Sequence, residues 1–288
     1  MRGPGVFGSA YGRMLERWPR APGSVDDVLG REMVLLAPET APALYQPPGS
    51  VRYGKGSRPE LERFVERAIA GVTGEEGKVR GIAQALGRWH HAFEESPAAA
   101  DYEAYRFGGT EESILARGSD NCADIARLAC ALYQVAGLPA RLGFLADTDQ
   151  AYCGHVICEV FYRVPAGPVR GLAPGALWGA VDPETNVVYQ HPDGRPASLW
   201  DLHRSPQLVE LHRGPGRVYT YPGQFRAVAI SHYDIADSER YDYTEVPLND
   251  YVRGIWRMGD AGWPGGLRWL FGEDGGEESR LDSARGSR

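Results

Sequence analysis

Lysine, long apolar runs and paired-cysteine motifs are all scarce in this sequence of 288 residues. Only Lys55 and Lys78 are lysines, so arginine supplies 29 of the 31 basic side chains (31 less 2). The net charge of −7 argues against a nucleic-acid groove, which needs a concentrated basic face. No segment approaches the roughly 20 consecutive apolar residues that cross a bilayer. We therefore expect no nucleic-acid partner and no association with a membrane.

Cysteine usage and the first twenty residues bear on compartment and cofactors. The start of the chain has no apolar segment of the kind that secretory signals carry, so a cytoplasmic location is expected. No C-x-x-C pair occurs, and in a chain of this length free thiols are expected rather than disulfides. Cys153 and His155 would share a strand face while Cys158 points the other way, so we expect no metal site there. No calcium-loop pattern occurs, and no cofactor is expected.

Helical periodicity dominates the first half of the chain. Apolar residues recur at helical spacing over residues 58–71 and 74–95, which predicts two amphipathic helices. A third helix begins at Asn121 and is apolar on nearly every side, which is typical of a helix buried in the middle of a domain. Gly137 ends it. Asn121 and Asp124 fit a pair of N-terminal capping residues.

The character of the sequence changes after this third helix. β-branched and aromatic runs broken by Gly, Pro and Asp predict strands over residues 140–146, 155–164 and 176–183. Further strands are expected over residues 217–222 and 225–233. Because helices precede strands instead of alternating with them, the pattern favours an α+β fold.

Three residues stand out by their position in these elements. Cys122 lies in the first turn of the buried helix, where unpaired amides and the helix dipole favour a thiolate. His155 opens a strand, and Asp182 ends another strand just before Pro183. A Cys–His pair gives an activated nucleophile, and a carboxylate on the other ring nitrogen fixes the tautomer. Cys122, His155 and Asp182 are therefore a candidate catalytic triad for nucleophilic acyl transfer.

Simpler interpretations of the same residue types stay open. Cysteine is among the residues most often buried, and a core role is the interpretation kept for Cys130, Cys153 and Cys158. An Asp-Pro pair at 182–183 is also typical of a plain strand-ending turn. Five of the six other histidines are interpreted as structural: His90, His91, His203, His212 and His232.

Residues 109–142 resemble the nucleophile helix of transglutaminase-like proteins. In that family a Gly-rich turn leads to Cys, then to a helix, then to a Gly-Ile-Pro-Ala-Arg-like stretch, which here is residues 137–141. Residues 154–162 resemble the His-bearing strand of the family, and residues 177–183 resemble its Trp-then-Asp-Pro strand, with Trp178 matching. The order of these blocks supports the same triad.

The resemblance covers roughly residues 60–190 and also takes in the helix before the nucleophile. It implies a papain-like, transglutaminase-core α+β fold, with the nucleophile helix packed on an antiparallel β-sheet. Two departures stand out: Asp120 replaces the Gly that the family more often has, and residues 165–175 form an insertion expected to shape the substrate mouth.

The implied function is thiol-dependent acyl transfer through a Cys acyl-enzyme, forming or exchanging an amide bond. The donor would be a peptide amide, a protein amide or an acyl-thioester, with an amine or water as acceptor. Some stand-alone bacterial members of similar size form amides in natural-product assembly. Hydrolysis by a cysteine peptidase or amidase, and an inactive family member that binds a peptide or protein, are the alternatives.

The resemblance leaves the oxyanion site incomplete. The backbone N–H of Cys122 is one expected donor, and Trp89, Tyr102 and Tyr105 are the upstream candidates for the second.

Four parts of the chain are expected. Residues 1–55 are an N-terminal extension, and residues 56–200 are the transglutaminase-like catalytic core. Residues 201–271 contribute strands and a Trp-rich segment packed on the core. Residues 272–288 are a polar tail without aromatic residues, expected to be disordered.

Overall fold

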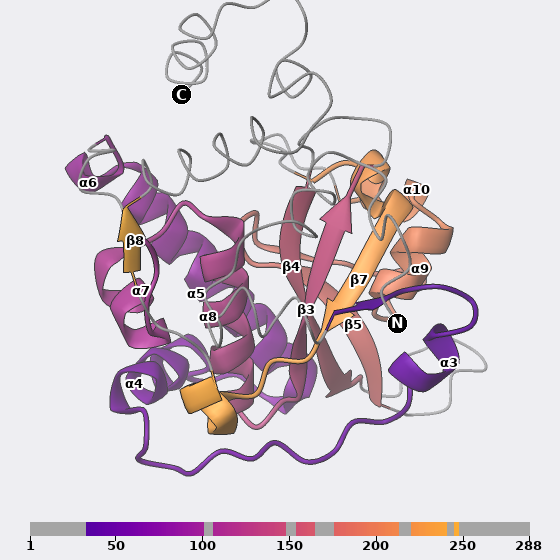
Figure 1. The fold of residues 1–288 in the computed structure, drawn as a ribbon. Coiled ribbons are helices and arrows are strands. Elements are labelled where there is room, and N and C mark those ends of the chain that lie inside the picture. The colour runs from indigo at the N-terminus through magenta and orange to yellow at the C-terminus, as the bar shows by residue number, and fades with distance from the viewer. Residues whose placement is uncertain are drawn as a thin grey trace, which may run out of the picture.

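The computed structural model describes residues 33–100, 106–147, 154–164, 176–212, 220–240 and 245–247. Helices gather against one face of a six-stranded antiparallel sheet, and shorter helices cover the other face (Figure 1). This arrangement confirms the predicted α+β class. No helix in the described ranges is long and apolar enough to span a bilayer.

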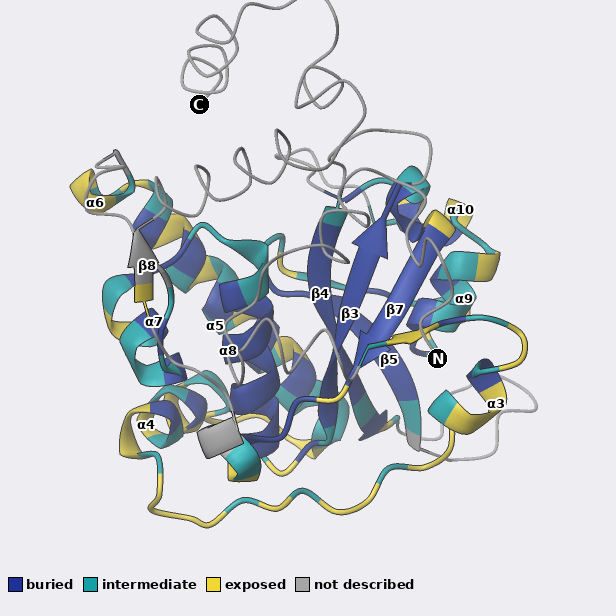
Figure 2. Ribbon diagram, in the orientation of Figure 1, coloured by how far each residue is buried: buried dark blue, intermediate teal, exposed yellow. Residues whose placement is uncertain are grey.

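The larger helical layer is built around one buried helix. Its members are α4 (Pro59–Ala68), α5 (Gly74–Glu94), α6 (Pro97–Ala100), α7 (Glu111–Arg117) and α8 (Cys122–Val135). Helix α8 is buried at every position from Asp124 to Gln134 (Figure 2), which accounts for its nearly uniform apolar sequence. Gly137 ends it with a φ of 82°, and the N–H of Leu138 donates to the carbonyl of Tyr133, as in a Schellman motif.

The main sheet has the order β1-β7-β3-β4-β5-β6. Its strands are β1 (Val34–Leu35), β3 (Ala140–Ala146), β4 (Gly154–Arg163), β5 (Ala176–Asp182), β6 (Val187–Val188) and β7 (Ala227–Ser231). Alternate residues of β4 enter different cores: Val156 and Cys158 join the apolar cluster of α8, and Ile157 joins that of α9 (Leu199–Arg204). Both faces of the sheet are thus covered, and β3 is buried along its whole length.

Smaller elements complete the described part. They are α3 (Ala41–Leu44), α10 (Gln207–Glu210), the 3-10 helices η1 (Pro222–Arg226) and η2 (Ile235–Arg240), and the pair β2 (Arg106–Gly108) and β8 (Glu245–Pro247).

The strand predicted over residues 225–233 is present as β7, but the one predicted over 217–222 is wrong in its described part. Thr220 and Tyr221 lie in no strand, and Pro222 begins η1. Proline has no N–H for a ladder, and its fixed φ suits the first turn of a helix. The 165–175 insertion, the Trp-rich segment with Trp256, Trp263, Trp269 and Phe271, and the 272–288 tail lie outside the described residues.

A buried ion pair ties the N-terminal segment to the sheet. Arg141 on β3 pairs with Glu159 on β4 at 2.6 Å, and its guanidinium lies 3.8 Å from the ring centroid of Trp178 and 4.8 Å from that of Tyr45. Glu159 also accepts the backbone N–H of Leu199. One buried pair therefore connects the segment after α3, two central strands and α9.

Candidate active site

Cys122 lies at the start of α8, in a first turn that is fixed by its cap. The side chain of Asn121 accepts hydrogen bonds from the N–H groups of Ala123 (2.9 Å) and Asp124 (3.3 Å). The N–H of Cys122 is at the first helical position, where a helix offers no internal acceptor. The thiol is free and partly exposed. The thiol of Cys122 is therefore presented at the positive end of a buried helix.

Asp124 does not cap the helix as the sequence suggested. Its carboxylate accepts hydrogen bonds from the N–H of Gly108 (3.2 Å) and from Arg117 (2.7 Å), and it lies 3.5 Å from Arg127. Asp124 lies in the first turn of α8, and its buried side chain points towards Gly108 of β2, Arg117 and Arg127. Burial raises the pKa of Asp124 to about 6 even beside both arginines. The contacts hold the start of α8 against β2.

His155 and Asp182 meet where β4 begins and β5 ends. Nε2 of His155 lies 3.1 Å from Oδ2 of Asp182, and both side chains are buried. The other carboxylate oxygen of Asp182 accepts the N–H groups of Glu184 (3.2 Å) and Thr185 (3.4 Å). The strand-ending turn therefore fixes the carboxylate, and the carboxylate fixes the ring.

The charges of this group support one another. Burial by itself would lower the pKa of His155, but the Asp182 carboxylate and a hydrogen bond with Cys122 hold it well above 6.5. Burial would raise the pKa of Asp182, yet His155 and the Thr220 hydroxyl keep it below its usual value. Each residue of the pair therefore favours the charged form of the other. The structure brings the three residues predicted from the sequence together.

Thr220 is a site residue that the sequence did not reveal. Its buried hydroxyl donates to Oδ2 of Asp182, the oxygen that also binds His155. A threonine 38 positions further along the chain carries no local motif, so only the folded chain identifies it. It restrains the carboxylate and favours its ionised form.

Thr220→Val is expected to slow the reaction of Cys122 by roughly 10- to 100-fold, the cost of about one hydrogen bond to a charged group. The pKa of Asp182 should rise without the hydroxyl, so the loss of rate on acidification should begin at a higher pH. Rates measured from pH 4 to 8 check this, with Thr220→Ser as the variant that restores the hydroxyl. A profile for Thr220→Val identical to wild type would contradict the role.

The other residues considered from the sequence are the candidate oxyanion donors and the remaining cysteines. Trp89 is not available as an oxyanion donor, because its indole N–H donates to the carbonyl of Leu115 at 3.0 Å. Tyr102, Tyr105 and Cys153 lie outside the described residues. Cys130 and Cys158 are buried thiols in the core around α8, and burial raises the pKa of Cys158 well above its ordinary value.

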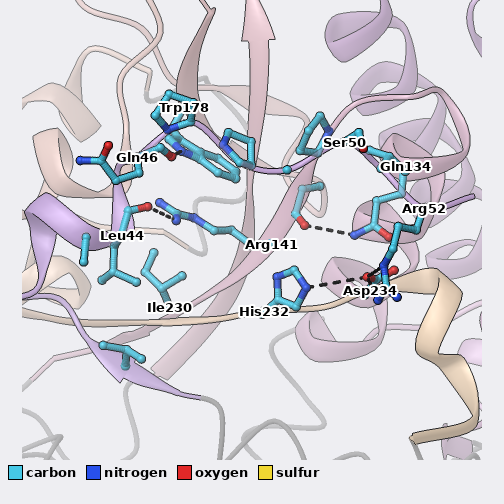
Figure 3. Close-up of a pocket in the computed structure, with 18 residues that line it drawn as sticks. Leu44, Gln46, Ser50, Arg52, Gln134, Arg141, Trp178, Ile230, His232 and Asp234 are labelled. Atoms are coloured by element: carbon cyan, nitrogen blue, oxygen red, sulfur yellow. Dashed lines mark hydrogen bonds and ion pairs between the residues drawn. The ribbon is translucent and has the colours of Figure 1, made fainter.

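A cavity of about 650 Å³ lies away from this group, beside the C-terminal half of α8 (Figure 3). It is lined by Gln134, Arg141 and Trp178 among others. Gln134 is twelve positions after Cys122, a separation of about 18 Å along a helix. Its polar groups are engaged, since Arg141 binds Glu159 and the carbonyl of Leu44. We assign no chemistry to this cavity.

A comparison with known protein families identifies the same part of the chain. Residues 62–183 match the family model described as the transglutaminase-like superfamily, a range that contains Cys122, His155 and Asp182. No curated protein and no solved structure matches the chain significantly. The superfamily typically comprises cysteine-dependent acyltransferases and peptidases that act on peptides and proteins. Residues 62–183 of this chain are a transglutaminase-like domain.

Proposed function

We propose that the protein is a cysteine acyltransferase that forms or exchanges an amide bond through an acyl-enzyme on Cys122. The observation that carries the proposal is the linked arrangement of the thiol at a helix start, His155 and Asp182. Each part has a chemical role: the helix start favours the thiolate, the imidazole exchanges its proton, and the carboxylate orients the ring.

The reaction follows from these positions. In the free enzyme the proton of the Cys122 thiol has already passed to His155, which leaves a thiolate beside an imidazolium, and this thiolate attacks the carbonyl carbon of an amide or thioester. The tetrahedral intermediate carries its charge on the former carbonyl oxygen, which the N–H of Cys122 stabilises. Collapse breaks the bond to the leaving amine or thiol, which receives the proton from His155. An amine then attacks the thioester, His155 accepts its proton, and Cys122 is released.

The first test is alkylation of Cys122 by iodoacetamide as a function of pH, followed by peptide mass spectrometry. Cys122 is expected to react at pH 6 to 7, where a free thiol with a pKa of about 8.5 is mostly protonated. The pKa of His155 is raised above 6.5, so its charge persists through this window and is lost only at higher pH. His155→Ala should therefore slow labelling roughly 10-fold or more at pH 6 and little at pH 9.

Cys130 and Cys158 are internal references, because both are fully buried in the folded protein and should stay unlabelled. If Cys122 reacts no faster than these two, or gives the same profile with and without His155, the proposed dyad does not exist. In that case an inactive, peptide-binding role becomes the better hypothesis.

The choice between transfer and hydrolysis needs a second measurement. The acyl-enzyme is formed from a reporter acyl-thioester and then offered a fluorescent primary amine in water. An amide as the main product supports the proposal, whereas free acid at every amine concentration favours the peptidase or amidase alternative.

A further inference from the structure

Three side chains of types that can bind a metal converge beside the proposed triad, and the proposed reaction uses none of them. His90 comes from α5, Asp120 from the loop before α8, and Glu184 from the turn after β5. Their ligating atoms all lie within 4.8 Å of one another, and Nε2 of His90 is 3.7 Å from a carboxylate oxygen of Asp120. Within the ranges that the structure describes, no other group of His, Cys, Asp and Glu has this geometry.

His90 supplies an independent observation that this is a binding site. Its side chain is only 2% exposed, and its Nε2 is a buried polar atom without a hydrogen-bond partner. Leaving such an atom unsatisfied costs about 1–3 kcal/mol. The nitrogen nevertheless faces carboxylates from two other segments, at distances too long for hydrogen bonds. An imidazole nitrogen in this position is suited to ligating a metal.

Two close backbone approaches hold the three residues in place. A Cβ at Gly87 would lie 2.8 Å from the Cβ of Asn186, and one at Gly118 would lie 2.1 Å from the ring of Phe93. Gly87 and Phe93 are each three positions from His90, about one turn of α5. The turn after β5, which carries Glu184, and the loop before α8, which carries Asp120, therefore both touch α5 within a turn of His90. The cluster is built by the packing of three separate segments.

A cavity of about 390 Å³ gives access to the cluster. His90 and Glu184 line it together with Glu94, His91 and the exposed Arg88. Four carboxylates, those of Glu94, Asp120, Asp182 and Glu184, act on this region. Among the described residues, the cations nearby are His155, 3.9 Å from Glu184, and Arg88 in the cavity wall, so the local field favours a further cation. Space next to the ligands allows water to complete the coordination.

The donor set selects the type of metal. Ca²⁺ and Mg²⁺ prefer oxygen ligands alone, whereas an imidazole suits zinc and similar ions. Zinc bound at about 2.0–2.1 Å by tetrahedral N and O ligands separates them by about 3.3 Å. The pair formed by His90 and Asp120 is 0.4 Å wider than that (3.7 less 3.3), and all three ligating atoms lie within 4.8 Å of one another. Zinc binding therefore requires the two carboxylates to move inward by up to about 1.5 Å.

We propose that His90, Asp120 and Glu184 bind a divalent transition-metal ion, with Zn²⁺ as the cation of best fit and an open fourth position for water. The sequence had given no metal site, and interpreted His90 as structural. The site adjoins the proposed triad, since a carboxylate oxygen of Glu184 lies 3.9 Å from Nδ1 of His155. A bound metal would therefore place positive charge next to the imidazole.

Zinc titration of the full-length, tag-free protein tests the proposal. Cys122→Ser and Cys153→Ser are introduced together so that these two thiols cannot bind metal, and binding is followed by calorimetry. Co²⁺ serves as a second probe, because its visible absorption reports the geometry of the site. His90→Gln and Glu184→Gln should each weaken binding about 100-fold or more, beyond the 10- to 100-fold typical of losing an outer-shell partner.

His91→Gln is the matched control. His91 follows His90 on the same helix and lines the same cavity, but it is 68% exposed and lies near Glu94 and Glu95 at the surface. The parent is the protein that carries Cys122→Ser and Cys153→Ser. If the His91→Gln variant binds one equivalent of zinc as tightly as this parent, the result supports the buried site. Absence of binding in the parent, unchanged binding in both His90→Gln and Glu184→Gln, or loss of binding in His91→Gln overturns it. Circular dichroism shows whether each variant folds. If either His90→Gln or Glu184→Gln does not fold, the zinc affinity of the other decides the test.

Discussion

Asp182→Asn is expected to slow acyl-enzyme formation on Cys122 by roughly 10³- to 10⁴-fold, the scale seen when a triad carboxylate becomes an amide. One oxygen of Asp182 accepts two backbone N–H groups, so the carbonyl of the new amide should stay there. Its NH₂ group would then face Nε2 of His155. That nitrogen must become the acceptor, which leaves the ring proton on Nδ1. An imidazole in this tautomer cannot take the proton of the thiol.

The measurement is single-turnover acylation by a reporter thioester, with iodoacetamide labelling at pH 6 in parallel. Asp234→Asn is a suitable control, because it also removes a shielded carboxylate, 12% exposed and paired with Arg52, near the distant cavity. It should leave both rates within about twofold of wild type, because the hydrogen bonds of Asp234 go to Arg52 and the N–H of Ala236 and not to the proposed triad. Equal rates for Asp182→Asn and wild type would contradict the orienting role of Asp182.

Arg127→Met is expected to destabilise the folded protein by about 3–5 kcal/mol, the usual cost of removing one partner of a buried ion pair. Arg127 is 2% exposed and lies 3.5 Å from Asp124 and 3.7 Å from Glu111. It also donates to the carbonyl of Gly109 at 3.0 Å. Methionine fills part of the volume but leaves two buried carboxylates with less counter-charge. Urea unfolding at pH 7 measures the loss.

The pH dependence gives this prediction a second test. Burial would raise the pKa of Glu111, but Arg127 and Arg58 hold it below 4.5. A lowered folded-state pKa stabilises the protein above the unfolded value and loses that effect as the pH falls. The difference between Arg127→Met and wild type should therefore shrink towards pH 4.

Arg63→Met is the matched control for stability. Arg63 pairs with Glu60 on the surface of α4, and both side chains are more than half exposed. Such a pair contributes about 0–1 kcal/mol, so this variant should unfold almost as wild type does. A loss below about 1 kcal/mol for Arg127→Met would mean that the network around Asp124 does not hold the start of α8.

Much of the core follows from local sequence. The apolar surface of residues 122–135, the Gly137 ending and the β-branched runs after residue 140 each favour one element, and the structure contains them. The three candidate catalytic residues lie at the ends of these elements, where periodicity changes and motifs are readable. Their proximity was an expectation from their complementary chemistry and from the resemblance to transglutaminase-like proteins. Their catalytic role remains a proposal.

The sequence by itself determined the helices, the central strands and the triad candidates, because each depends on residues close together in the chain. Only the tertiary structure decided the inward turn of Asp124, the hydrogen bond from Thr220 to Asp182, and the pairing of β7 with both β1 and β3. It alone brought His90, Asp120 and Glu184 together. The contacts of Asp124 with Arg117 and Gly108 reach 7 and 16 positions along the chain, and the others join segments tens of residues apart. Buried polar groups take whichever partners the packed backbones bring within reach. No local pattern encodes that choice.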